Sequence, residues 1–94
     1  MMAAHQEYHL TSVPTARWHL YHDACQMARE DHQEHEWLHG RPERAAAFAW
    51  GRFVRLNAFD DEEFACEWFC NAYAVEWQRL DKARARQSAE GGTM

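Results

Sequence analysis

Residues 60–80 read DDEEFACEWFCNAYAVEWQRL and carry the clearest helix signal in the chain. Asp60 can cap the first turn of a helix, and Glu63 stands three positions later, as in a capping box. Apolar side chains then recur every three or four residues, which is the period of an α-helix with one buried face. We therefore predict a helix over residues 61–86, whose buried stripe contains Ala65, Trp68, Phe69, Ala72, Tyr73, Val75 and Leu80.

Two more helices are predicted before this one. A hydroxyl cap followed by Pro14 is a typical helix start, and the helix that it opens, over residues 13–38, ends before Gly40 and Pro42. Proline at the first helical position then opens a second helix over residues 42–57. Short connections between three helices favour a small all-α fold, an up-down-up antiparallel bundle.

The 94 residues are expected to form a single helical domain. Residues 1–12 show only a brief alternation of polar and apolar side chains, so we predict a short N-terminal arm. The helical core spans residues 13–86. Residues 87–94 are small and polar, which predicts a frayed C-terminal tail.

The predicted helices differ in length, and this difference predicts an exposed surface. At about 1.5 Å per residue the outer helices span roughly 39 Å and the middle helix roughly 23 Å. The outer helices therefore overhang, which is expected to leave Trp18, Tyr21 and Trp77 uncovered. Large aromatic side chains are frequent binding hot spots. We predict that these three residues bind a partner.

The densest negative charge in the chain lies at the start of the third predicted helix. Acidic side chains in a first turn favour the helix dipole, and they also steer a partner of opposite charge. The partner is therefore expected to be a protein with a basic surface, and association of two copies through the exposed aromatics is an alternative. The acidic residues assigned to the binding surface are Asp60, Asp61, Glu62, Glu63 and Glu67.

One short motif suggests metal chemistry. Residues 35–39, HEWLH, match H-E-x-x-H, in which two histidines one helical turn apart hold zinc and the glutamate is the general base. His32 lies on the same predicted face, so His35, His39 and His32 are the candidate metal ligands. Against this reading, the basic end of the third helix lies nearby and a small bundle offers little room for a cleft. We expect no catalytic residues and no cofactor.

Composition excludes several classes of function. A net charge of −5 disfavours direct binding of nucleic acid, which needs a cationic face. The sequence shows no basic and apolar leader and no apolar run long enough for a membrane span, so we expect a cytoplasmic protein that does not bind membranes. Cys25, Cys66 and Cys70 are an odd set and are expected to be free thiols, with a mixed site of thiolates and histidines as the alternative.

The favoured interpretation is a non-catalytic protein-binding module, an inhibitor or regulator that docks on a larger complex, such as one that holds nucleic acid. In size, charge and helical content the chain resembles the small proteins of phages and other mobile elements, including anti-CRISPR proteins. The alternative is a histidine-rich metal-binding or metal-dependent protein that uses the HEWLH pattern.

Overall fold

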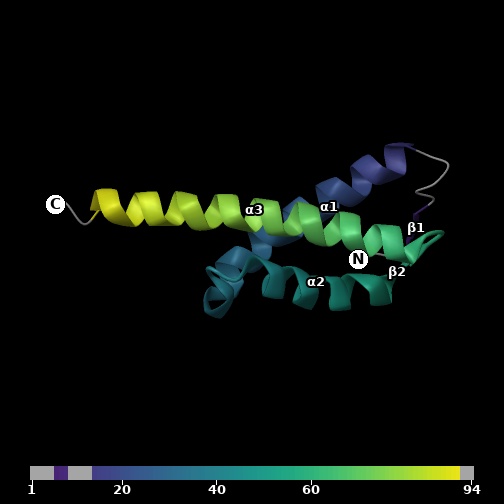
Figure 1. Cartoon of the computed structure of the whole chain (residues 1–94), viewed down its shortest axis with the longest axis horizontal. Helices are drawn as coiled ribbons and strands as arrows, with labels where there is room; N and C mark the ends of the chain where they lie inside the picture. Colours follow the sequence, from purple (N-terminus) through teal and green to yellow (C-terminus); the bar gives the residue numbers. More distant parts are fainter. Residues whose placement is uncertain (1–5, 9–13, 92–94) are drawn as a thin grey trace.

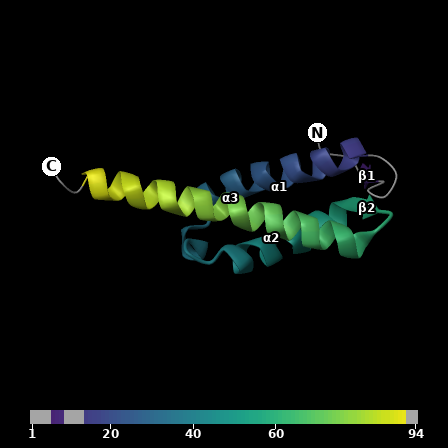
Figure 2. The ribbon, with the colours of Figure 1, turned by 45° about the horizontal axis from the view of Figure 1, so that its top comes forward.

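The computed structural model describes residues 6–8 and 14–91 and confirms the predicted all-α bundle (Figure 1). The helices are α1 (Pro14–Glu34), α2 (Pro42–Leu56) and α3 (Glu62–Gly91), with a short 3₁₀ helix η1 (Glu36–Leu38) after α1. Helices α1 and α3 run in the same direction and α2 runs in the opposite one, as Figures 1 and 2 both show. The arrangement is therefore up-down-up.

Helix α3 is the spine of the bundle, because α1 and α2 each pack along it. Alanines on the facing sides let the backbones approach closely, while a row of rings from Phe53 through Phe69 and Tyr73 to Trp77 fills the centre. The rings in this row are stacked, with centroids 4.7–5.8 Å apart. The alanines buried in the core are Ala24, Ala28, Ala45, Ala46, Ala49, Ala65 and Ala72.

The first helix is shorter than predicted. It ends at Glu34, and residues 36–38 form η1 instead of continuing the α-helix to residue 38. The break lets Leu38 drop into the core, where its carbonyl oxygen accepts a hydrogen bond from the Trp77 indole at 3.1 Å. Burial of Leu38 therefore decides the course of the chain at this point, against the helical periodicity.

The third helix differs from prediction at both ends. Its cap is Asp61 and not Asp60, because the Asp61 Oδ1 atom accepts the backbone N–H of Phe64 at 3.0 Å. At the other end α3 continues to Gly91, five residues beyond its predicted end at about residue 86. Residues 92–94 of the predicted tail lie outside the described residues.

A small parallel sheet, which the sequence did not indicate, closes one end of the bundle. Strand β1 (Gln6–Tyr8) pairs with strand β2 (Asn57–Phe59), with Gln6 opposite Asn57 and Tyr8 opposite Phe59. Part of the predicted arm, residues 1–12, therefore pairs with the connection between α2 and α3. The other residues of that arm, 1–5 and 9–12, lie outside the described residues. None of the described helices is long and apolar enough to cross a membrane.

The exposure of three residues is the opposite of what was predicted. Trp77, expected to be exposed, is 0% exposed, because η1 and the end of α1 cover α3 at this level. Trp68 and Val75, expected in the core, are 41% and 60% exposed. The overhang of α3 starts later than predicted, and residues 82–88 are all exposed.

Candidate functional site

The most distinctive surface of the molecule lies along α1 and α3. Helix α2 covers other parts of α3, so apolar side chains on this side are left without a neighbouring helix. Trp18 and Tyr21 of α1 are 59% and 50% exposed, and Tyr21 lies beside the exposed Trp68 and Val75 of α3. We call this surface the open face; it comprises Tyr21, Phe64, Glu67, Trp68, Asn71 and Val75, and the exposed Trp18 lies about one helical turn before Tyr21 on α1.

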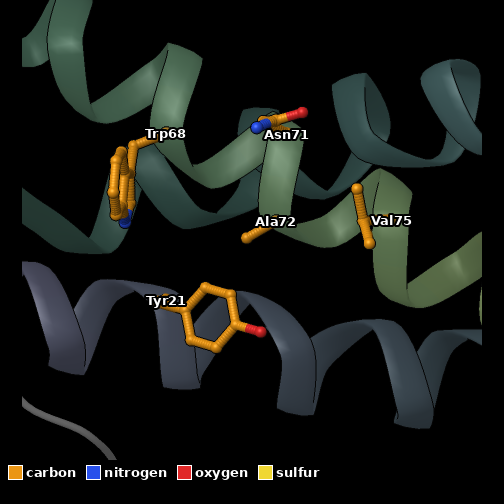
Figure 3. A pocket seen from close by; sticks show the side chains of 5 residues that line it. All are labelled: Tyr21, Trp68, Asn71, Ala72 and Val75. Carbon is orange, nitrogen blue, oxygen red and sulfur yellow. The ribbon is translucent and has the colours of Figure 1, made fainter.

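The open face is hollowed into a groove. One hollow of about 170 Å³ is lined by Tyr21 of α1 and by four residues of α3 (Figure 3). A second hollow of about 320 Å³ adjoins it towards the start of α3 and shares Trp68 and Asn71 with it. Because the two hollows share these lining residues and lie next to each other on α3, we call them together the groove. Its lining residues are Tyr21, Phe64, Glu67, Trp68, Asn71, Ala72 and Val75.

Contacts within the chain hold the aromatic rings on and near the open face in place. The Phe64 and Trp68 rings stack with centroids 5.7 Å apart and planes 14° from parallel. The Arg17 guanidinium lies 5.4 Å from the centre of the Phe64 ring, and Trp18 stacks on His22 at 5.2 Å. Side chains ordered before binding lose less conformational entropy when a partner arrives. The open face is therefore partly preorganised.

Acidic side chains lie at the end of the groove where α3 begins. Glu62, Glu63 and Glu67 are exposed, and Glu67 itself lines the groove. Asp60 is exposed, whereas Asp61 is half-buried as the helix cap. Of the predicted acidic residues, Glu67 lines the hollow that adjoins the one beside the predicted Tyr21, whereas Asp60 to Glu63 precede it at the start of α3 and line neither hollow.

The predicted binding residue Trp77 is buried away from this surface, and three apolar residues that were not predicted to bind belong to it. Trp77 is buried in the core, so its assignment to the partner-binding surface is wrong. Phe64, Trp68 and Val75 contribute instead. A sequence signal for them exists: residues 64, 68, 71 and 75 are spaced by four, three and four, which marks a second stripe on the same helix.

The three candidate histidine ligands are divided between two clusters. In the first, His32 is buried and its Nε2 atom lies 2.8 Å from Asp81 Oδ1. The His39 ring stacks on the His32 ring at 3.9 Å, and its Nε2 atom donates a hydrogen bond to the His32 carbonyl oxygen at 2.7 Å. Asp81 also accepts the Gly40 N–H at 2.9 Å. This cluster joins the end of α1 and the connection to α2 with α3.

His35 lies in the second cluster, with Asp31 and Glu34. The H-E-x-x-H interpretation needs His35 and His39 one turn apart on a single α-helix, but α1 ends before either residue. The prediction that His32, His35 and His39 form one metal-binding face is therefore wrong. Asp31 is also engaged elsewhere, since its Oδ2 atom accepts hydrogen bonds from Tyr73 and Arg52.

The cluster of His32, His39 and Asp81 is the better candidate for a metal. One donor atom from each side chain lies within 4.8 Å of the others. However, the His32 and His39 rings are stacked 3.9 Å apart and only 17° from parallel, so the in-plane lone pairs of their nitrogens lie in separate, nearly parallel planes and do not converge on one ion. Zinc needs donors that converge on it at about 2.0–2.1 Å. A ring must rotate before this cluster can hold a metal.

The cysteines are free thiols, as predicted. Burial is the main cause that raises the pKa of Cys25. Burial and, second, the neighbouring Cys66 raise the pKa of Cys70 to about 12. Because the thiolate is the nucleophilic form of cysteine, the raised pKa values disfavour Cys25 and Cys70 as nucleophiles at neutral pH.

Comparisons of this chain with protein-family models, with curated proteins and with solved structures find no match.

Proposed function

We propose that this protein is a non-catalytic protein-binding module that docks through the open face. The observation that carries the proposal is the exposed groove of Tyr21, Trp68 and Val75, which continues into the acidic start of α3. Exposed apolar patches that are bordered by polar residues are typical of sites of interaction between proteins.

The chemistry of the groove defines the partner. An amphipathic helix laid along α3 could bury its apolar side chains against Trp68 and Val75, which is a common way for proteins to recognise helices. Basic side chains at one end of that helix would meet Glu62, Glu63 and Glu67. We propose that the module inhibits or regulates a larger complex with a basic surface, in the manner of small phage proteins such as anti-CRISPRs.

The experiment is affinity capture from a lysate of the producing cells, followed by binding curves with the purified captured protein. Trp68→Ala removes a ring of the open face, and Trp37→Ala is the matched control, because Trp37 is an exposed tryptophan on η1. We expect Trp68→Ala to weaken binding at least tenfold and Trp37→Ala to leave it unchanged.

The same binding assay can test the contribution of the acidic side chains. Glu62→Lys combined with Glu63→Lys should lower the affinity and reduce its dependence on salt, because exposed charges are screened within about 10 Å at 0.1 M salt. A captured protein that binds wild type, Trp68→Ala and the charge-reversed variant equally would contradict docking through the open face.

A second candidate function, metal binding, is favoured by the grouping of His32, His39 and Asp81. Calorimetric titration with zinc tests it, with His39→Ala as the variant and His35→Ala as the control from the other cluster. Our first proposal predicts no stoichiometric binding at micromolar zinc. One zinc per chain, lost in His39→Ala and kept in His35→Ala, would support the metal function instead.

A further inference from the structure

We infer that the partner that fits the open face is helix α3 of a second copy, packed antiparallel to form a two-fold symmetric dimer. This inference rests on the first part of the proposed function, that the open face is a protein-docking surface, and not on the docking of a larger complex. It is supported by the spacing of the exposed side chains on α3, by the overhang of that helix and by the distribution of charge along it.

The exposed side of α3 has the spacing of a helix-packing seam. Its residues are separated alternately by four and three positions, which is the repeat by which two helices pack along their whole length. We call this row the seam; it consists of Phe64, Trp68, Asn71, Val75, Gln78 and Lys82. Phe64 is half-buried and the other five residues are exposed. Residues 64, 68, 71 and 75 line the groove.

The length of α3 indicates that the other half of the seam also needs a partner. With 30 residues α3 spans about 45 Å, whereas α1 with 21 residues spans about 32 Å. Residues 82–88 are all exposed beyond the other helices, and α3 extends past them in Figure 1. A helical segment this short is marginal in water without tertiary contacts. A second helix laid beside it would supply those contacts.

Charge selects the orientation. On the seam side, the start of α3 carries Glu67 and the overhang carries Lys82 and Arg86, whereas Glu62, Glu63 and Arg84 add charge of the same sign at each end away from the seam. In an antiparallel pair each acidic start lies beside the basic overhang of the other copy, and symmetry repeats the match at both ends. A parallel pair would place like charges together, which costs free energy. Arg84 also lies 4.0 Å from Glu36 of its own chain, but both side chains are mostly exposed and the pair is weak.

The seam also has a defined register. A two-fold axis crossing between Asn71 and Val75 places these two residues opposite each other in the two copies. Trp68 then faces Gln78, and Phe64 faces Lys82, whose aliphatic stem and ammonium group can cover an aromatic ring. The groove beside Tyr21 receives the middle of the partner helix.

The first test is the solution mass by sedimentation equilibrium from 1 to 200 μM. We expect wild type to approach twice the chain mass of 11.1 kDa, and Val75→Arg to stay monomeric with an unchanged far-ultraviolet circular dichroism spectrum. Trp37→Ala, which changes the exposed tryptophan of η1, is the control and should dimerise like wild type. A wild-type chain that is monomeric at 200 μM would overturn the inference, and so would dimerisation of Val75→Arg with wild-type affinity.

Charge reversal tests the orientation. One variant carries Glu62→Lys, Glu63→Lys and Glu67→Lys, and another carries Lys82→Glu, Arg84→Glu and Arg86→Glu. Each alone should dimerise at least tenfold more weakly than wild type, whereas an equimolar mixture should form a mixed dimer and the variant with all six changes should dimerise again. Reversed variants that each dimerise as well as wild type would contradict the antiparallel pairing.

The inference and the proposed function can fail separately. A monomeric wild type whose binding to a captured protein still depends on Trp68 would overturn only the dimer. A Val75-dependent dimer with no other Trp68-dependent partner would support the dimer and reject docking on a larger complex.

Discussion

Asp31 is the residue that joins the three helices. Its carboxylate is buried on α1, and its Oδ2 atom accepts hydrogen bonds from Tyr73 of α3 and from Arg52 of α2, both at 2.5 Å. The Arg52 side chain is 43% exposed and can reach water, whereas the Tyr73 hydroxyl cannot. Loss of the carboxylate would therefore leave the buried Tyr73 hydroxyl without this hydrogen-bond partner.

We predict that Asp31→Ala lowers the free energy of unfolding by about 2–4 kcal/mol, because it leaves a buried hydroxyl unsatisfied and removes a charged pair. Tyr73→Phe should cost about 1 kcal/mol, since Arg52 still pairs with the carboxylate. Urea denaturation measures both values. If both changes lowered the free energy of unfolding equally, the carboxylate would stabilise the protein only through its hydrogen bond with Tyr73.

Glu76 gives the molecule an acid-sensitive contact. Hydrogen bonds from Arg79 and then from Arg29 lower the pKa of Glu76, although burial opposes them. A carboxyl group whose pKa is lowered in the folded state stabilises the protein above its unfolded pKa of about 4.3. That stabilisation is lost as the pH falls through the lower, folded pKa.

We therefore predict that Glu76→Gln is less stable than wild type by about 1 kcal/mol at pH 7, a modest value because both guanidinium groups are largely exposed. The difference should shrink as the pH falls from 4 towards 2. Thermal unfolding at a series of pH values measures it. A difference that is constant from pH 7 to pH 2 would show that the charge of Glu76 is irrelevant.

At the scale of elements, the start of α3 depends on one cap. Asp61 Oδ1 accepts the Phe64 N–H, and Asp61→Ala should cost about 1 kcal/mol, the usual value for a helix cap. Asp61→Asn is the matched control, because asparagine caps about as well, and it should retain nearly all of the stability. Urea denaturation compares the three proteins, and an equal loss in Asp61→Asn would point to charge as the cause.

At the scale of the whole molecule, two tryptophans on one helix have opposite roles. Trp77 is enclosed by Tyr73, His32 and His39 and donates its indole N–H to Leu38, whereas Trp68 lies on the open face. We predict that Trp77→Ala costs about 3–5 kcal/mol and unfolds much of the protein at 37 °C. Trp68→Ala should keep the circular dichroism spectrum and cost less than about 1 kcal/mol.

Circular dichroism and thermal melting compare these two variants directly. A folded Trp77→Ala with a melting temperature near that of wild type would place Trp77 outside the core. An unfolded Trp68→Ala would mean that the open face contributes to stability, and would remove it as a test of binding.

The helices could be predicted from the sequence because they depend on interactions between residues close together in the chain. Helical periodicity, Pro14, Pro42 and the acidic first turn of α3 were enough to predict three helices and their up-down-up order, because these signals act within a few residues. The acidic run at the start of α3 was identified from the same local signals.

Only the tertiary structure decided which side of α3 is covered. Residues 60–80 carry two apolar stripes, and periodicity cannot tell which of them meets α1 and α2, so Trp68 and Trp77 were each assigned to the wrong environment. The end of α1 was decided by the burial of Leu38 against Trp77, 39 positions along the chain. Because α1 ends at Glu34, His35 and His39 lie in different side-chain clusters. Long-range packing outweighs local propensity at such points, because burying large apolar side chains is worth more than one further turn of helix.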